Sequence, residues 1–392
     1  MTGLAAPTLS QPAPAPCLET GEGKNAEPPR HQILELDGFR AIAILWVLLL
    51  HFVYGWPPIP PTALSRVPRI FVGAISHGWL GVDLFFILSG FLITGILVDA
   101  RGKPKYFRNF YARRALRILP LYLICIAVMA LAYRGQRPFF GLSLLFMANF
   151  AHYFRVGIPH GPGVFWSLAV EEQFYLLWPL LVRFLRRSSL FGLTLVLVLG
   201  TPILRGYCAY MGMDMVREIY VYSFFRFDGL ALGAILAMWV RSDYYNRKMA
   251  WRFAGLLVGF DVLITLCSLP FRVMEAHTVA SCALRPTQAQ FLFAAAMVVA
   301  LAYRGSTYTA ILRSRPARVA AELSFCLYLI HLALGDGYYK VLHAVHFNDV
   351  AHFGMDGAVF VRFLVIGTAS FGLAALSRRF LEEPILKLKR YF

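Results

Sequence analysis

Residues 37–51 read Asp-Gly-Phe-Arg-Ala-Ile-Ala-Ile-Leu-Trp-Val-Leu-Leu-Leu-His, an apolar stretch that carries three ionisable side chains. The stretch is long enough to enter a bilayer, where an ionisable side chain costs about 2.5–3.5 kcal/mol and normally faces a bundle interior or a wet cavity. Arg40 and His51 are eleven residues apart, so on a helix they point in nearly the same direction, with Asp37 one turn before Arg40. We expect one helical stripe to hold a histidine about 16 Å from an arginine.

Each of these residues, taken alone, also has a purely structural interpretation. Arg40 could extend its guanidinium to the membrane surface, and His51 could be hydrogen-bonded by a neighbouring helix. For each residue, a structural role and a functional role both stay open until other ionisable residues are placed at the same depth.

The composition predicts an all-α membrane protein. Of the 392 residues 58% are hydrophobic, and apolar runs recur from one end of the chain to the other. We expect about ten transmembrane helices, in residues 33–54, 79–99, 115–133, 165–182, 189–206, 220–240, 252–269, 287–303, 319–335 and 358–377. A further run, residues 139–150, is too short to cross comfortably and is expected to be a re-entrant or surface helix.

The distribution of basic residues predicts the orientation. If residues 139–150 do not cross and the N-terminus is inside, most lysines and arginines fall on the inner side, as the positive-inside rule requires. Their densest cluster is an expected inner loop at residues 101–117. The fewer outer basic residues are Arg66, Arg69, Arg134, Arg137, Arg155, Arg205, Arg217, Arg272, Arg285 and Lys340. Both termini are then expected to be cytoplasmic.

The remaining features exclude other classes of protein. The net charge of +17 is accounted for by the inner loops, and no separate soluble domain carries the basic patch that nucleic-acid binding needs. The six cysteines are scattered, without the paired spacing of a zinc site or a disulfide framework, so we expect no metal. Residues 1–32 are rich in alanine and proline and lack the apolar core of a cleavable signal peptide, so we expect a disordered cytoplasmic tail.

The expected helix directions bring further polar residues to the level of His51, in the outer half of the bundle. They are Asp83, Glu171, Glu172, Arg226, Asp228, Tyr328 and His331. So many ionisable groups from several helices at one depth favour a polar cavity over isolated structural ion pairs. Asp83 also shares a helix face with Gly90 and Thr94, a stripe of small residues that permits close helix packing.

These motifs resemble the acyltransferase-3 family of integral-membrane O-acyltransferases, over residues 33–385. The matching motifs are the Arg40 and His51 spacing, residues 81–86 with 89–93, Arg-Ala-Leu-Arg at 114–117, residues 166–175, Arg-Phe-Asp-Gly at 226–229, and Tyr-Leu-Ile-His at 328–331. Phe325 departs from the family, which usually has a second tyrosine there. Some relatives add an extracytoplasmic hydrolase-like domain. Here we expect only a short basic cytoplasmic tail, residues 386–392, after the membrane domain.

The resemblance implies transfer of an acyl group, most often acetyl, from cytoplasmic acyl-CoA to a hydroxyl of a cell-surface glycan or its lipid-linked precursor. It favours a bacterial inner (plasma) membrane and implies no bound cofactor. By match of motif, His51 is expected to be catalytic with Arg40 as its companion, and Arg114 and Arg117 to serve the donor.

The chemistry of the residue types agrees with this implication. Arginine suits the phosphates of acyl-CoA, and histidine suits removal of a hydroxyl proton near neutral pH. Glu171 or Asp83 could orient the His51 ring, whereas Arg226 could stabilise an oxyanion or form a structural pair with Asp228. Direct transfer and a covalent acyl-histidine intermediate both remain open.

A proton-coupled or small-molecule transporter is the alternative from a different functional class, because proton relays also use intramembrane histidines and carboxylates. The two halves of the sequence show no internal repeat and no matched pair of interrupted helices, which are the usual signs of a transporter site. The acyltransferase interpretation is therefore preferred.

Overall fold

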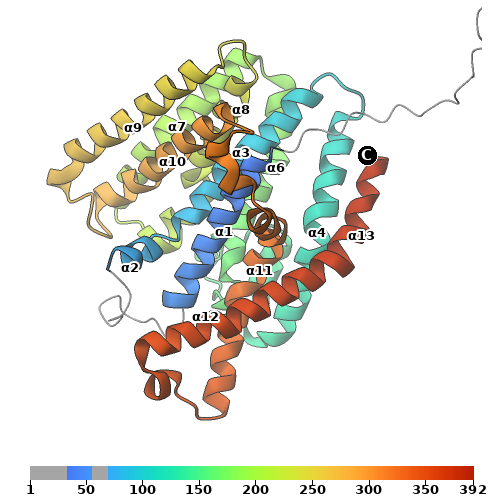
Figure 1. Cartoon of the computed structure of the whole chain (residues 1–392), viewed down its shortest axis with the longest axis vertical. Coiled ribbons are helices and arrows are strands. Elements are labelled where there is room, and N and C mark those ends of the chain that lie inside the picture. Colours follow the sequence, from blue (N-terminus) through green and yellow to red (C-terminus); the bar gives the residue numbers. More distant parts are fainter. Residues whose placement is uncertain (1–32, 55–68) are drawn as a thin grey trace, which may run out of the picture. The chain divides into compact units, whose positions relative to one another are not determined.

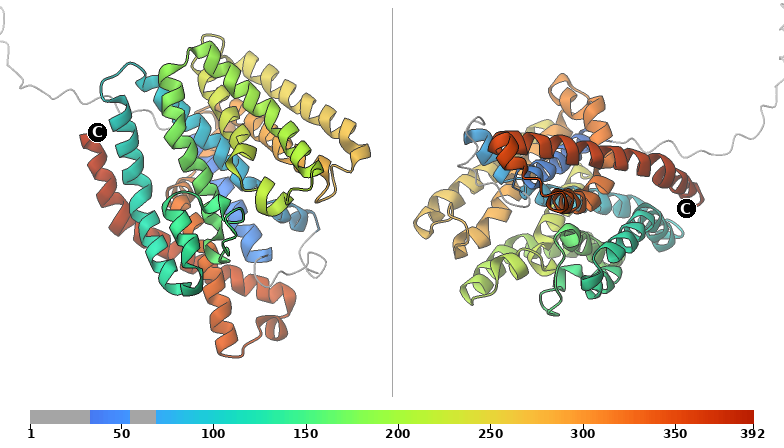
Figure 2. Two further views of the ribbon diagram at one scale, coloured as in Figure 1. Left: turned by 180° about the vertical axis from the view of Figure 1, so that it is seen from behind. Right: turned by 90° about the horizontal axis from the view of Figure 1, so that it is seen from below.

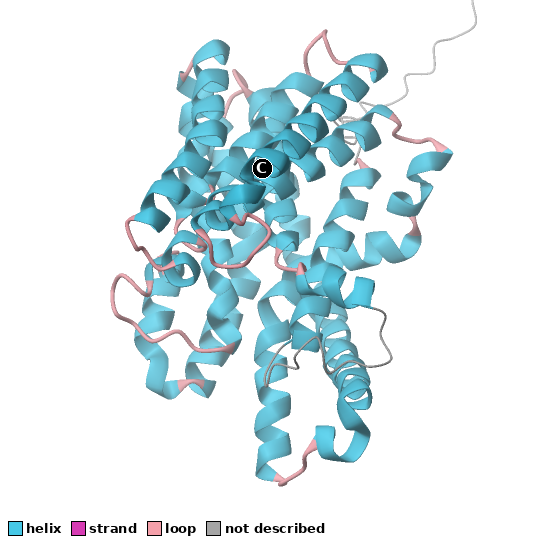
Figure 3. Ribbon diagram, turned by 90° about the vertical axis from the view of Figure 1, so that its left-hand side faces the viewer, coloured by secondary structure: helices cyan, strands magenta, loops and turns pink. Residues whose placement is uncertain are grey.

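A computed structural model describes residues 33–54 and 69–392, and this part of the chain contains helices and no strands (Figure 3). The tail 1–32, predicted to be disordered, and Arg66 lie outside the described residues. The helices are α1 Leu34–Tyr54, α2 Arg69–Ser76, α3 Leu80–Ala100, α4 Tyr106–Ala132, α5 Arg137–Leu144, α6 Phe165–Phe184, α7 Arg187–Tyr210, α8 Phe227–Val240, α9 Arg247–Ser268, α10 Val279–Ala302, α11 Arg315–Ala344, α12 Asp349–Ser377 and α13 Glu383–Leu386 (Figure 1).

Eight helices of the described part are long and apolar enough to cross a membrane: α1, α3, α4, α7, α9, α10, α11 and α12. The other two expected spans also fall on helices. Of these, α6 carries Glu171 and Glu172, and α8 has only 14 residues. The segment 139–150 forms the eight-residue α5 and a short turn of 3-10 helix, at about 1.5 Å per residue far too short to span. The all-α, multi-pass membrane class is confirmed.

Two expected boundaries are wrong. The helix predicted to begin at residue 115 begins earlier, at Tyr106, so the loop before it is shorter than expected. Arg114 and Arg117, expected at the start of this helix, lie in the third and fourth turns of α4. Arg205 was assigned to an outer loop, but it lies inside α7 with 1% of its surface exposed. Both errors have one cause: arginine usually marks a helix end in a membrane protein, unless a buried partner compensates its charge.

The centre of the bundle is the pair α3 and α8, which pack on each other more extensively than any other two helices. Both are buried along most of their length and are surrounded by α1, α6, α7 and α10. The close approach depends on glycines, because a β-carbon at Gly90 would overlap the backbone of Leu230, and one at Gly233 would overlap the carbonyl of Ile87. The close helix packing predicted for the small-residue stripe on α3 is confirmed at Gly90.

α1 and α11 lie side by side and run in the same direction. The start of α1 contacts the segment before α11 through Gly38 and Leu312, and the far end of α1 meets α11 through His51 and His331. α11 continues to Ala344, and α12 then turns back and packs against α11 at an angle (Figure 2). This arrangement places the two histidines of the sequence motifs next to each other.

We expect Gly90→Ala to lower the thermal unfolding midpoint of the detergent-solubilised protein, because α3 and α8 must separate to admit the methyl group, at about 1–3 kcal/mol. Gly200→Ala, in α7 with open space around the added carbon, is the matched control and should leave the midpoint unchanged or raise it. Equal midpoints for Gly90→Ala and the unsubstituted protein would contradict the packing described here.

Candidate functional site

A cavity between α1, α3, α4, α6 and α11 holds about 100 Å3 accessible to water. We call it the central cavity. Five residues predicted for the site line it: Arg40, Arg114, Arg117, Glu171 and Tyr328. Its other polar lining residues are Ser89, Ser167, Tyr175 and Ser324. The structure therefore brings together residues from helices that are far apart in the sequence.

Three arginines gather at the central cavity. The Arg40 guanidinium lies 3.3 Å from the Asp37 carboxylate, and that of Arg114 lies 5.0 Å from the centre of the Tyr175 ring. Arg117 interacts electrostatically with both other arginines. Like charges repel, so three cations facing one cavity favour an anion between them, and guanidinium groups bind phosphate oxygens with two hydrogen bonds each.

Glu171 lies toward these arginines. Its carboxylate accepts hydrogen bonds from Ser89 Oγ at 2.9 Å and from the Tyr175 hydroxyl at 2.8 Å. It also interacts electrostatically with Arg40 and Arg114. Glu172, the next residue on the helix, does not line the central cavity, and its buried Oε1 has no hydrogen-bond partner in the described part of the chain. The two adjacent glutamates therefore have different surroundings.

The His51 and His331 rings form a pair, with His51 Nδ1 3.1 Å from His331 Nε2 and ring centres 4.9 Å apart. His51 Nδ1 also lies 2.9 Å from the carbonyl oxygen of Val47, and His331 Nδ1 lies 2.9 Å from that of Tyr328. A carbonyl oxygen only accepts, so each neutral ring carries its proton on Nδ1. His331 Nε2 then accepts from His51, and the lone pair of His51 Nε2 is left available as a base.

Tyr328 lies between the histidine pair and the central cavity. Its ring centre is 5.9 Å from that of His331, and its hydroxyl is 2.5 Å from Ser167 Oγ at the cavity wall. Phe325, one turn earlier on α11, also lines the cavity and adds no hydroxyl there. The polar contact that a second tyrosine would make in the family is therefore replaced by an apolar surface.

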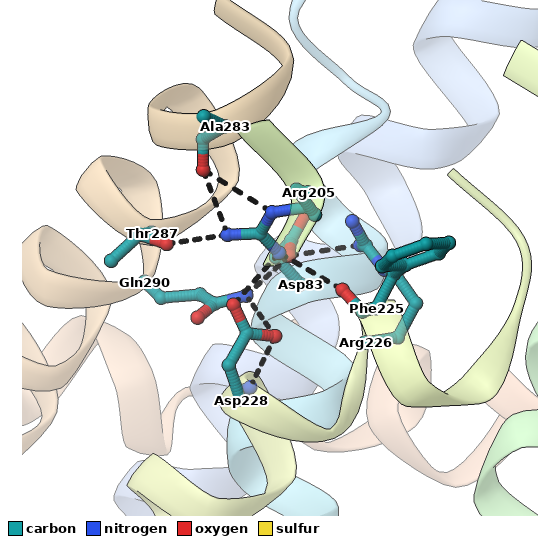
Figure 4. Close-up of polar contacts among 9 residues, drawn as sticks. Asp83, Arg205, Phe225, Arg226, Asp228, Ala283, Thr287 and Gln290 are labelled. Atoms are coloured by element: carbon teal, nitrogen blue, oxygen red, sulfur yellow. Dashed lines mark hydrogen bonds and ion pairs between the residues drawn. The ribbon is translucent and has the colours of Figure 1, made fainter. Parts of the chain in front are cut away.

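Asp83, Arg226 and Asp228 belong to a separate buried network, shown in Figure 4. Arg226 donates to Asp83 at 2.9 Å, so its partner is not Asp228, the partner considered in the sequence analysis. Asp228 instead accepts from Arg205 at 2.8 Å, and Gln290 donates to both aspartates. Asp83 forms its hydrogen bonds inside this network and none with His51, so the ring is held by a backbone carbonyl and a second histidine.

The network is almost fully enclosed. Asp83 and Asp228 are 0% exposed, and Arg205 and Arg226 are 1% exposed. Arg205 also donates to the backbone carbonyls of Phe225 and Ala283 and to Thr287 Oγ1 (Figure 4). Two positive and two negative charges thus join α3, α7, α8 and α10. Each charge has an oppositely charged partner, which is what makes such a buried group tolerable, although Asp83 Oδ2 and Arg226 Nε have no hydrogen-bond partner in the described part of the chain.

Sequence reasoning missed several residues that complete these groups. Ser89, Ser167 and Tyr175 stand inside the motifs quoted above. Ser167 and Tyr175 lie one helical turn before and after Glu171, a spacing that could have drawn attention, whereas Ser89 lies on another helix. Thr287 and Gln290 lie outside those motifs, and only their place in the fold identifies them.

Comparison with known proteins identifies the family of the chain. The sequence profile of the family described as an acyltransferase domain matches residues 33–379. The chain belongs to the acyltransferase-3 family. It is 26% identical over 389 residues to the peptidoglycan O-acetyltransferase OatA of Listeria monocytogenes, covering 91% of this chain and 56% of that protein. It is 26% identical over 397 residues to the O-acetyltransferase OatA of Staphylococcus aureus, covering 90% of this chain and 57% of that protein.

The chain thus spans about half the length of the curated relatives it matches. No solved structure matches it. The family assignment therefore applies to the membrane domain, in which the central cavity, the histidine pair and the buried network all lie.

We expect Arg205→Met to lower the stability of this family member by about 3–5 kcal/mol, because Asp228 would be left buried without its cation. Arg217→Met is the control, since Arg217 is 68% exposed and lies 4.0 Å from Asp214 at the surface, where an ion pair contributes little. Thermal unfolding of both variants in the same detergent measures the difference. Similar midpoints for the two would show that the network does not stabilise the bundle.

Proposed function

We propose that this chain is a membrane O-acyltransferase. It transfers an acyl group, acetyl by similarity to its relatives, from acyl-CoA to a hydroxyl of a cell-surface glycan or lipid-linked sugar. The observation that carries the proposal is the central cavity, which is lined by three arginines and by Tyr328, and Tyr328 in turn contacts the His51–His331 pair. The arginine-lined cavity and the histidine pair thus lie on either side of Tyr328, although neither His51 nor His331 lines the cavity.

In this proposal Arg40, Arg114 and Arg117 bind the phosphates of acyl-CoA. The thioester then extends along the central cavity toward Tyr328. Basic residues in the loops of a membrane protein are usually explained by the positive-inside rule. These three arginines, however, line a cavity inside the helical bundle. That position favours a role in donor binding over topology alone.

His51 is proposed as the general base. His51 Nε2 takes the proton from the acceptor hydroxyl, and the oxygen attacks the thioester carbonyl carbon. The carbon–sulfur bond of the tetrahedral intermediate breaks, and the CoA thiolate takes the proton from His51. The Val47 carbonyl and His331 Nε2 hold the ring in the required tautomer and stabilise the imidazolium that forms. Glu171 then acts with Tyr175 and Ser89 to position the arginines instead of orienting His51.

The acceptor is proposed to be a glycan of the cell envelope. The supporting fact is that the Listeria relative is named a peptidoglycan O-acetyltransferase. The basic donor side is proposed to be cytoplasmic, with both termini on that side and the membrane being the bacterial inner membrane. Acceptor hydroxyls then reach the histidine pair from the opposite side.

We predict that His51→Ala reduces acyl transfer at least about 100-fold, because the base is lost. The protein should still fold, because alanine is small enough to fit in place of the imidazole ring. The measurement is release of free CoA from acetyl-CoA by purified protein, with and without a peptidoglycan-derived oligosaccharide. Acceptor-dependent release that survives the substitution would overturn the assignment of His51. Movement of a substrate without thioester consumption would favour the transporter alternative.

We predict that Arg117→Ala raises the KM for acetyl-CoA about tenfold or more, because a charge-assisted contact to phosphate is lost. Arg108→Ala is the matched control on the same helix. Arg108 is exposed and lies over the Phe392 ring, 5.4 Å from its centre, away from the cavity lining. If both variants change the KM equally, the effect comes from surface charge and the central cavity does not bind the donor.

A further inference from the structure

A second cavity lies beside the buried network, between the start of α3, α7, α8 and the first turns of α10, and holds about 380 Å3. We call it the vestibule. Its charged and aromatic lining residues are Trp79, Arg205, Tyr220, Arg226, His277 and Arg285. Among the described residues no carboxylate lines it. The surface of the vestibule is mainly apolar, and its charged groups are cationic, so the charged ligand that it favours is an anion.

The three arginines of the vestibule are not equivalent. Arg205 and Arg226 form ion pairs with Asp228 and Asp83, neither of which lines the vestibule (Figure 4). Arg285 forms no ion pair within the described residues. It donates to His77 Nε2 at 2.9 Å, and its guanidinium lies 5.8 Å from the centre of the Trp79 ring. Arg285 therefore adds an uncompensated positive charge to the cavity wall.

The contact with His77 positions Arg285 without neutralising it. An arginine only donates, so His77 Nε2 accepts, and His77 Nδ1, 2.8 Å from the carbonyl of Gly73, carries the ring proton. His77 is thus a neutral support for the guanidinium. The Arg285 side chain is held by this hydrogen bond and by the nearby Trp79 ring, and its remaining N–H groups form no hydrogen bond with the residues that the structure describes.

Arg226 provides a second, independent sign of a ligand. It is 1% exposed and lines the vestibule, yet its buried Nε has no hydrogen-bond partner in the described part of the chain. A buried guanidinium N–H without an acceptor costs about 1–3 kcal/mol, so Arg226 would gain from an acceptor atom placed beside its guanidinium. The Tyr220 ring, 4.9 Å from the Arg226 guanidinium, completes an aromatic and cationic wall.

The vestibule lies at the same end of the bundle as the histidine pair. His77 is followed by Gly78, and a β-carbon there would touch the backbone of Trp46 and the side chain of Leu50, next to His51 on α1. We propose that the vestibule binds an anionic group, a phosphate or a carboxylate, of the acceptor, with Arg285 as its principal anchor. The identity of the ligand as acceptor rests on the function proposed above, whereas anion binding by Arg285 does not.

The test uses the full chain in nanodiscs of zwitterionic phosphatidylcholine, with inorganic pyrophosphate as the anion and saturating CoA to occupy the arginines of the central cavity. Calorimetric titration should show that Arg285→Gln weakens pyrophosphate binding about tenfold or more. Arg285→Lys should retain most of the binding. Arg217→Gln, an exposed arginine in the neighbouring segment, is the control and should bind like the unsubstituted protein.

Equal binding by Arg285→Gln and the unsubstituted protein, or no pyrophosphate binding at all, would overturn the proposal. Retained CoA binding and an unchanged unfolding midpoint establish that Arg285→Gln is folded. His51→Ala should bind pyrophosphate normally, so failure of the transferase assignment and failure of the anion site are separate results. Nanodiscs containing anionic phosphatidylglycerol distinguish the source of the anion. If phosphatidylglycerol abolishes the part of the pyrophosphate binding that requires Arg285, the vestibule holds a lipid headgroup. That result would contradict the assignment of the ligand as acceptor.

Discussion

The need to compensate buried charge governs this bundle. Asp83, Arg226, Asp228 and Arg205 come from α3, α7 and the start of α8, and each has an oppositely charged partner. Asp83, Asp228 and Arg205 form further hydrogen bonds. Removing any one of them would leave a charge in an apolar interior, where solvent cannot replace the partner. The network therefore fixes how α3, α7, α8 and α10 sit against one another, and the glycine contact between α3 and α8 brings the helices close enough for it to form.

α3 connects this network with the proposed site. Asp83 is part of the network, while Ser89, further along the same helix, donates to Glu171 at the central cavity. Three sets of polar groups bear on the proposed reaction: a neutral network that holds helices, arginines that converge on a cavity, and a histidine pair next to Tyr328. This division assigns stability to the first set and leaves the other two for donor binding and proton transfer in the proposed reaction.

The sequence predicted the class of the fold because apolar runs and their flanking charges follow directly from the cost of burying polar groups in lipid. The helix stripe of Arg40 and His51 and the position of Tyr328 near His331 followed from helical spacing alone. What could not be predicted was pairing over long separations. Asp83 is 143 residues from Arg226 and 207 from Gln290 in the sequence. Similar expected depths in the membrane therefore placed the charged residues of this network in one cavity with His51, whereas they form a separate network.

The same limit explains the partner of His51. A carboxylate at a similar depth was the natural candidate, but hydrogen bonding to Val47 lies within one helix turn, and His331 is brought in by the parallel packing of α1 and α11.

The most direct test of the proposed transferase activity is mass spectrometry of envelope glycans from three strains: one with the intact protein, one without it, and one with His51→Ala. The account predicts that a mass increase of one acyl group on a glycan is present only with the intact protein. The same acylated glycans in all three strains would contradict it.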